Sequence, residues 1–299
     1  MLLVAAFIWG TAFVAQKIGG DIGTFTYNGI RMTIGGLVLI PVALISDRGS
    51  VAKAAYSEKS PEEKAKARRI LILGGIVCGV ILFFGTNLQQ LGLAYTTAGK
   101  AGFITSLYTI FVPIVSILVG KRVRPVIWLC AVMGVFGLYL LSMAGGGAFR
   151  LSRGDLLILL CSFCFTFHIM SIDYFSPRVN GIKLSCIQFF VAGALSLIVM
   201  AVTEHPDLHV ILHYWTSILY TGILSSAVGY TLQIVAQKHA EPTQATLIMC
   251  MESVFAALAG AVVLSERMSG REFLGCAIIF IAVIISVLPE RKGRSSLKG

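Results

Sequence analysis

Charged side chains are scarce in this sequence. Asp, Glu, Lys and Arg together make up 13% of the 299 residues, whereas a typical soluble domain carries roughly 25% charged residues. Hydrophobic residues make up 57% of the chain, and the mean hydropathy is +0.86. A soluble protein with this composition would have too little polar surface to stay dispersed. The composition therefore excludes a soluble domain and indicates a polytopic membrane protein.

Several motifs that carry chemistry are also missing. The sequence has no phosphate-binding loop, no nucleophile elbow and no pair of catalytic carboxylates, so ATP-driven transport and hydrolysis are unsupported and we expect no cofactor. It has no basic surface domain, which argues against nucleic acid as a partner. All seven cysteines fall within hydrophobic runs. We therefore interpret Cys161 and Cys164, spaced as in a redox pair, as small packing residues.

Long hydrophobic runs, by contrast, are abundant in the sequence. Backbone groups in a bilayer must be paired internally, and runs such as LILGGIVCGVILFF do not alternate as strands of a β-barrel would. The sequence thus predicts an all-α membrane protein with ten transmembrane helices. The predicted spans are residues 2–18, 28–46, 70–92, 98–119, 126–143, 154–171, 184–202, 213–237, 242–264 and 271–288.

The distribution of basic residues predicts the orientation of these spans. With the N-terminus inside, seventeen of the 24 lysines and arginines fall on the inner side. This bias favours two cytoplasmic termini, a cytoplasmic loop at 47–69 and an external loop at 203–212. We interpret the first run as a membrane span and not as a signal peptide. Lys17, Arg31 and Lys100 are expected at the outer mouth, with side chains reaching toward the interface.

A weak internal repeat divides the chain in two. Shifting the sequence by 144 residues aligns Gly85 with Gly229, Gln89 with Gln233 and Phe111 with Phe255. We interpret residues 1–144 and 145–299 as two repeats of five spans each. Because five is odd, the second repeat enters the membrane upside down. Such inverted repeats are typical of carriers that work by alternating access around a site near the bilayer midplane.

Three stretches carry a resemblance to a known family. FIWGTAFVAQKIG, RMTIGGLVLIP and ESVFAALAGAVVLSERMSGREFLGCAIIFIAVIIS resemble the EamA family of the drug/metabolite transporter superfamily, and the resemblance covers essentially the whole chain. It implies a ten-helix, exporter-like carrier in a bacterial inner membrane, whose relatives carry amino acids, sugars, nucleotide sugars and drugs. The chain departs from the family pattern at Ser253, where a proline often follows the glutamate. It departs again at Lys121, where the first half usually has the acidic residue that Glu266 supplies in the second.

Glu252 is the strongest candidate for a binding residue. It lies ten residues after Pro242, which places it about 15 Å into a bilayer core of about 30 Å. An ionisable group at that depth is costly and usually serves a pathway. Its counterpart under the 144-residue shift is Tyr108. A twofold axis in the membrane plane would bring the two close together. The structural alternatives are a carboxylate tied to a neighbouring helix and a packed tyrosine.

Other polar and aromatic residues in the spans are secondary candidates for the substrate site. Amides facing lipid are costly, so these side chains should point inward, where they either line a cavity or bond helix to helix. For Trp9 and His168 the alternatives are a packed aromatic ring and a neutral, hydrogen-bonded histidine. The full set is Trp9, Asn87, Gln89, Gln90, His168, Tyr230, Gln233 and Gln237.

Histidines also recur in the loop before the eighth span. His205, His209 and His213, with Asp207 nearby, have the spacing of one helix face that could bind zinc. Pro206 and the start of the next span interrupt that face, so we expect no metal site.

The sequence therefore predicts a transporter and not an enzyme. We expect a secondary active or facilitative transporter that exports a small metabolite, such as an amino acid or a related compound, by alternating access. The alternative is a membrane-embedded enzyme that acts on a lipid head group with Glu252 and His168 as base and partner. The expected partners are the small-molecule substrate and the lipid bilayer. The sequence leaves open whether the chain forms a homodimer.

Overall fold

The fold is known from a computed structural model that describes residues 1–46, 60–96, 98–142, 152–263 and 269–288. That part of the chain is helical and contains no strand. The helices are α1 (Leu2–Ile18), α2 (Thr24–Ser46), α4 (Pro61–Leu93), α5 (Ala98–Thr105), α6 (Tyr108–Leu118), α7 (Pro125–Ser142), α8 (Arg153–Phe175), α9 (Gly181–Thr203), α10 (Leu208–His213), α11 (Trp215–Leu219), the π-helix η1 (Tyr220–Tyr230), α12 (Thr231–Gln237), α13 (Pro242–Met249), α14 (Met251–Val263) and α15 (Gly270–Val287).

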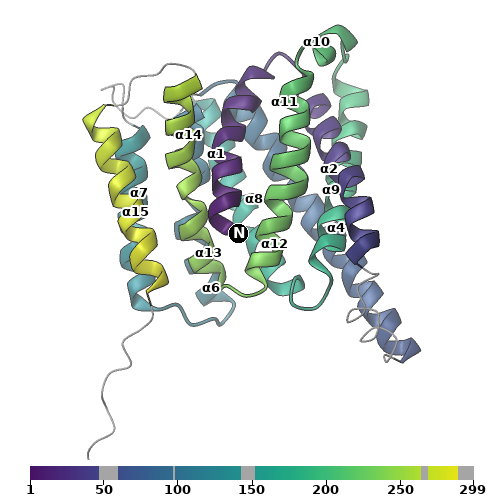
Figure 1. The fold of residues 1–299 in the computed structure, drawn as a ribbon, viewed down its shortest axis with the longest axis horizontal. Helices are drawn as coiled ribbons and strands as arrows, with labels where there is room; N and C mark the ends of the chain where they lie inside the picture. The colour runs from purple at the N-terminus through teal and green to yellow at the C-terminus, as the bar shows by residue number, and fades with distance from the viewer. Residues whose placement is uncertain (47–59, 97, 143–151, 264–268, 289–299) are drawn as a thin grey trace, which may run out of the picture.

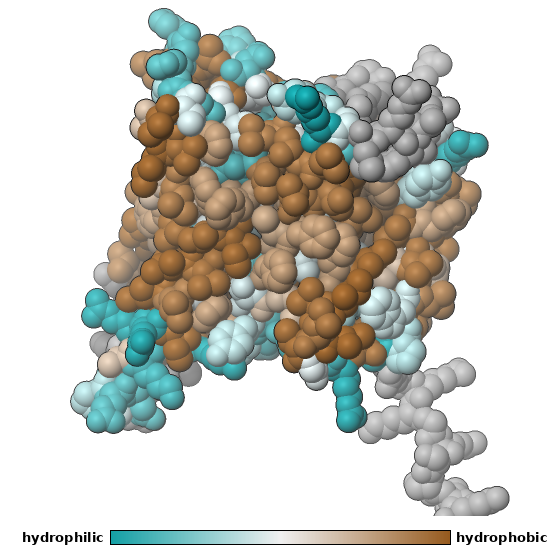
Figure 2. Space-filling model, turned by 180° about the vertical axis from the view of Figure 1, so that it is seen from behind, coloured by the Kyte–Doolittle hydropathy of each residue, from teal (hydrophilic) through white to brown (hydrophobic). Residues whose placement is uncertain are grey.

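The helices form a bundle with a hydrophobic girdle. Within the described residues, eight helical segments are long and apolar enough to cross a membrane, and Leu2–Ile18 and Pro125–Leu140 are two shorter apolar helices. Each predicted span overlaps one of these segments, with bounds that differ by up to nine residues in the third span. Hydrophobic side chains form a broad band around the middle of the molecule, and hydrophilic side chains gather at its two ends (Figure 2). The chain is a multi-pass membrane protein.

The basic segment before the third span and the span itself form one helix. The Ser60 hydroxyl accepts a hydrogen bond from the Glu63 backbone N–H (3.2 Å), and the Glu63 carboxylate accepts one from the Ser60 N–H (2.9 Å). With Pro61 at the first helical position, this is a capping box. The resulting helix α4 is 33 residues long, and its first turns project from the bundle (Figure 1).

Helix α2 begins four residues before its predicted start because a distant residue caps it. The Glu204 carboxylate accepts hydrogen bonds from the backbone N–H groups of Phe25 (3.0 Å) and Thr26 (2.8 Å). These are two of the donors that a helix N-terminus leaves unpaired. A Cβ on Gly23 would lie 2.4 Å from the same carboxylate, so a larger residue there would displace the Glu204 side chain from the cap.

Two spans are broken near their midpoints, although neither break contains a proline. The fourth span breaks between α5 and α6, where the Thr109 N–H donates to the Ser106 carbonyl (3.0 Å). The ninth span breaks between α13 and α14, where the Ser253 N–H donates to the Cys250 carbonyl (3.2 Å). Each of these hydrogen bonds joins residues three positions apart instead of four, so the helix is locally tighter than an α-helix. Tight turns inside a helix often mark a functional hinge.

The helices pack in a consistent set of pairs. Helix α2 contacts α9, α4 contacts α8, α7 contacts α15, and α1 contacts α14. The pair α7 and α15 forms one flank of the bundle and α2 and α9 lie toward the other, with α1 and the η1 span between them (Figure 1). Gly10 permits the close approach of α1 and α14, since a Cβ there would lie 2.5 Å from the Glu252 carbonyl oxygen.

Candidate functional site

A small cavity lies at the centre of the bundle. Its volume is about 40 Å³, enough for a few water molecules only. A metabolite can therefore bind there only if the surrounding helices or side chains move. Seven of the ten predicted site residues line this cavity: Trp9, Gln89, Tyr108, His168, Tyr230, Gln233 and Glu252.

The Glu252 carboxylate is buried and held by hydroxyl groups. Only 4% of the residue is exposed. One carboxylate oxygen accepts hydrogen bonds from the Tyr108 hydroxyl (2.9 Å) and the Ser106 hydroxyl (3.2 Å). Glu252 lies in the first turn of α14, where the positive end of the helix dipole favours a negative charge. The two residues that correspond under the 144-residue shift are thus direct partners.

Tyr230 forms the centre of an aromatic cluster beside the carboxylate site. Its ring centroid lies 4.9 Å from that of Trp9, 5.8 Å from that of His168 and 5.8 Å from that of Phe189. The Trp9 indole N–H donates to the Ser225 carbonyl at 3.1 Å. Ser225 belongs to the π-helix η1, a form that is frequent at functional sites. Trp9, His168 and Tyr230 of this cluster line the cavity and give it an aromatic wall, in which the rings meet edge-on or at a tilt.

Three polar atoms around the cavity have no hydrogen-bond partner among the described residues. They are the Gln16 Oε1, the Gln233 Oε1 and the His168 Nδ1, and all three residues line the cavity. Buried polar atoms in proteins are nearly always paired with protein or water. Such atoms beside a cavity can bind water or substrate. Gln89 is already engaged, because its amide donates to the Thr105 hydroxyl at 3.4 Å.

The other three predicted site residues lie outside the central cavity. The Asn87 amide oxygen accepts a bond from Asn28 (3.0 Å) and its nitrogen donates to Ser196 (3.0 Å), so Asn87 bonds helix to helix. The Gln90 amide donates to the Gln16 carbonyl at 3.4 Å. Gln237 lines a second cavity.

Arg31 is a cavity residue that the sequence analysis placed elsewhere. We expected its side chain to reach the membrane interface, but only 2% of the residue is exposed and it lines the central cavity. Because α2 begins at Thr24, Arg31 lies about 10 Å along the helix instead of in its first turn. Of the other two basic residues, Lys17 is exposed and donates to the Thr96 carbonyl (3.3 Å). The side chain of Lys100 lies outside the described part.

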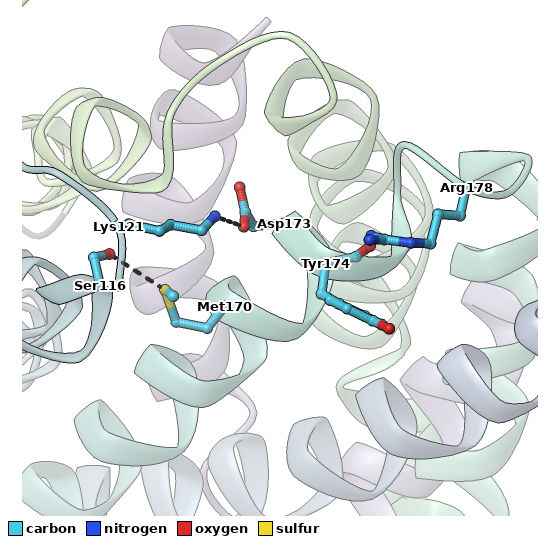
Figure 3. A network of polar contacts seen from close by, with 6 residues as sticks. All are labelled: Ser116, Lys121, Met170, Asp173, Tyr174 and Arg178. Carbon is cyan, nitrogen blue, oxygen red and sulfur yellow. Dashed lines mark hydrogen bonds and ion pairs between the residues drawn. The ribbon is translucent and has the colours of Figure 1, made fainter. Parts of the chain in front are cut away.

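The second cavity opens near the end of the bundle where α6, α8 and α12 finish. Its volume is about 600 Å³, and Lys121, Asp173, Gln237 and Lys238 are among its lining residues. Lys121 and Asp173 form an ion pair across this cavity wall, as Figure 3 shows. One turn before Asp173, the Met170 sulfur accepts a hydrogen bond from the Ser116 hydroxyl (3.6 Å). These two contacts tie the end of the fourth span to α8.

The histidines of the loop before the eighth span do not form a metal site in the described structure. The Asp207 side chain accepts a bond from the His209 backbone N–H (2.8 Å) and caps the short helix α10. No group of three or more metal-binding side chains occurs in the residues that the structure describes.

The sequence resemblance is confirmed by a family model. The model of the EamA-like transporter family matches residues 1–143 and 152–288. This chain belongs to the EamA-like transporter family. The central cavity is therefore the candidate substrate site of a membrane transporter.

Relatives of this EamA-like protein occur in archaea, bacteria and plants. An "Uncharacterized transporter" from Archaeoglobus fulgidus is 31% identical over 286 residues, which are 95% of this chain and 83% of that protein. The WAT1-related protein At3g02690, chloroplastic, from Arabidopsis thaliana is 26% identical, with 97% and 69% of the two chains covered. The "Uncharacterized inner membrane transporter YedA" from Escherichia coli is 22% identical, with 94% of this chain and 87% of that protein covered. A solved crystal structure shares the fold at a TM-score of 0.75 and 20% identity, covering 96% of this chain and 94% of that one.

Proposed function

We propose that this EamA-like protein exports a small metabolite, such as an amino acid or a related compound, across the inner membrane by alternating access. One observation carries the proposal. Tyr108 and Glu252 correspond under the 144-residue shift, and they meet in a hydrogen bond beside a buried cavity. Residues related by a twofold axis touch only if they lie next to that axis. Carriers built from inverted repeats bind their substrate near such an axis and expose that site to the two sides of the membrane in turn.

The breaks in two spans support an inverted duplication into ten spans. The break at Ser106 in the fourth span and the break at Cys250 in the ninth are also 144 residues apart. Discontinuous helices at corresponding positions of two repeats are typical of carrier substrate sites. The two stretches that match the EamA family model fall on either side of residue 144, which agrees with the proposed repeats, 1–144 and 145–299.

The packing pairs also support a twofold relationship. In the proposed repeats α1 corresponds to α8, and α14 corresponds to α6. Helix α1 contacts α14, and α8 contacts α6, so the contact recurs when the two halves are exchanged. Likewise α2 contacts its own counterpart α9, and α7 contacts its counterpart α15. Because each repeat has five spans, the axis would lie in the membrane plane.

The same geometry disfavours an enzyme that uses Glu252 and His168 together. The His168 Nε2 is bonded to the Gln188 Oε1 at 3.0 Å, and Glu252 is bonded to hydroxyl groups. No hydrogen bond joins the two proposed catalytic residues, both of which belong to the described part. Their cavity lies in the centre of the bundle, away from the ends where lipid head groups would be.

The orientation follows from the basic residues. The start of α4 and the end of α15 lie at one end of the bundle, and α10 lies at the other (Figure 1). This arrangement agrees with cytoplasmic termini and an external loop at 203–212. The relative YedA is named as an inner membrane transporter, which supports the same membrane for this chain.

Metabolite profiling tests the proposed function directly. Cells that overproduce the protein should lose one metabolite from the cytoplasm and accumulate it in the medium. Cells that overproduce Glu252→Gln to the same level provide the matched control, and they should resemble cells with empty vector. If no metabolite changes between wild type and this control, while both proteins reach the membrane, the proposed export function is wrong.

A further inference from the structure

Arg31 presents an unpaired charge to the central cavity. Its Nε donates to the Asn28 side-chain oxygen at 2.7 Å, and its guanidinium carbon lies 5.8 Å from the centroid of the Tyr27 ring. The two terminal nitrogens have no hydrogen-bond partner in the described part of the chain, and no carboxylate there forms an ion pair with them. Asn28 is itself bonded to Asn87 at 3.0 Å. The guanidinium is therefore fixed at one edge while its other edge remains available.

Glu252 is the opposite case in the same cavity. Its contacts are hydroxyl groups, and no described Lys, Arg or His forms an ion pair with it. Arg31 and Glu252 both line the cavity, but they do not pair with each other. Leaving one buried charge without a counter-charge is strongly destabilising. Two such charges of opposite sign in one cavity indicate a ligand that neutralises both.

We propose that Arg31 binds the carboxylate and Glu252 binds the ammonium group of a small zwitterion. The inference rests on the proposed transport function and assigns the two charged groups of the substrate to named residues. A guanidinium binds a carboxylate through two parallel hydrogen bonds, and the free edge of Arg31 offers that geometry. An ammonium group has three N–H donors and no acceptor, so a carboxylate oxygen of Glu252 is a suitable partner for it. An anion alone leaves Glu252 without a counter-charge, and a cation alone leaves Arg31 without one.

The aromatic wall fits the remainder of such a ligand. Trp9, Phe165 and Tyr230 line the cavity together with the two charged residues. Their rings provide apolar contact for a hydrocarbon side chain and a favourable face for a cation. A zwitterion has no net charge, so its movement does not work against the membrane potential.

Matched probes on the wild-type protein give the first test. The full chain is reconstituted in proteoliposomes, and counterflow is measured with three zwitterions that differ in size and charge separation: glycine, L-leucine and 4-aminobutyrate. The comparison compounds are glycinamide and L-leucinamide, which lack the carboxylate, and 4-methylpentanoate and butyrate, which lack the ammonium group. We expect at least one zwitterion to exchange about tenfold faster than its singly charged counterparts. If the counterparts exchange equally fast, or if no probe exchanges, the inference is wrong.

Substitution of Arg31 gives the second test. Arg31→Gln should lower zwitterion exchange about tenfold and remove the preference over the amide, whereas Arg31→Lys should retain part of it. Lys17→Gln removes an exposed positive charge outside the cavity and should exchange normally. If Arg31→Gln exchanges the zwitterion normally while Glu252→Gln does not, the assignment of Arg31 is wrong and the transport function stands. A thermal melt of each variant separates unfolding from lost recognition, and the probe comparison on the wild-type protein needs no variant.

Discussion

Tyr108 and Glu252 lie 144 residues apart in the sequence and share a hydrogen bond of 2.9 Å between the tyrosine hydroxyl and the carboxylate. Substitution of these two residues should have unequal effects. Glu252→Gln keeps the size and an acceptor for Tyr108 but removes the charge, so transport should fall at least tenfold, as expected from the loss of about 1.4 kcal/mol of binding. Tyr108→Phe deletes one hydroxyl and should reduce transport less. Flux into proteoliposomes and a thermal melt of the same preparation measure both effects. Normal flux in Glu252→Gln, or a loss explained by early melting, would make Glu252 a structural carboxylate.

Single cysteines test the proposed orientation. In a background where the seven native cysteines are replaced, Lys66→Cys and His209→Cys place one thiol at each end of the bundle, and both positions are exposed. An impermeant maleimide should label His209→Cys in intact cells and Lys66→Cys only after the membrane is opened. Labelling of Lys66→Cys in intact cells would reverse the proposed topology.

The close approach of α1 and α14 makes Gly10 sensitive to a single methyl group. In Gly10→Ala the new Cβ would lie 2.5 Å from the Glu252 carbonyl oxygen and 2.8 Å from the Ala256 nitrogen. Both are backbone atoms that cannot rotate away, so we expect a loss of about 1–3 kcal/mol of stability and reduced transport. Gly134→Ala is the matched control, since its Cβ would meet only Leu247 at 3.9 Å. Equal melting temperatures for the two variants would contradict this account of α1 and α14.

We expect the Lys121–Asp173 ion pair to restrict access to the second cavity while contributing little to the stability of the fold. Its side chains are 42% and 16% exposed, and exposed pairs contribute about 0–1 kcal/mol. We expect Asp173→Asn to melt normally but to increase the labelling rate of a cysteine at Thr243, which lines that cavity. The exchanged pair, Lys121→Asp with Asp173→Lys, should restore slow labelling.

Arg178 provides the control for this experiment. It lies near the same end of α8, where its guanidinium donates to the Tyr174 carbonyl and covers the Tyr174 ring at 4.0 Å (Figure 3). Arg178→Gln should leave the labelling rate unchanged. If Asp173→Asn also leaves it unchanged, the ion pair does not control access.

The spans were predictable because hydropathy reports directly on the length of apolar helix that a bilayer requires. The pairing of Tyr108 with Glu252 also followed from the sequence, because the 144-residue offset identifies corresponding positions. The capping box at Ser60 is local as well, since its two partners are three residues apart. Features of this kind depend on neighbours in the sequence or on a repeat that the sequence displays.

The position of Arg31 was not predictable for a complementary reason. The N-terminus of α2 is capped by Glu204, a residue about 180 positions away, so no local signal marks the true start of the helix. A predicted start at residue 28 put Arg31 near the membrane surface. The four additional residues move it inward, to the cavity.

The irregular helices were also not predictable from the sequence. The break before Tyr108 and the π-helix Tyr220–Tyr230 contain no proline, and hydropathy does not distinguish hydrogen bonds that skip three, four or five residues. Polar residues such as Tyr230 and Gln233 indicate which face of the helix points inward. They do not reveal that the preceding segment is a π-helix.

The difference between Tyr108 and Glu252 has a consequence for the resting carrier. If the two halves were identical, turning the molecule over would interchange its inward-open and outward-open forms, and the two would be equally populated without a membrane potential. Because one half has a phenol at this position and the other half has a carboxylate, the two forms are no longer equivalent. Each form then has its own free energy, and a difference of about 1.4 kcal/mol suffices for a tenfold excess of one. In the proposed alternating-access cycle, this pair is therefore one source of a free-energy difference between the inward-open and outward-open forms.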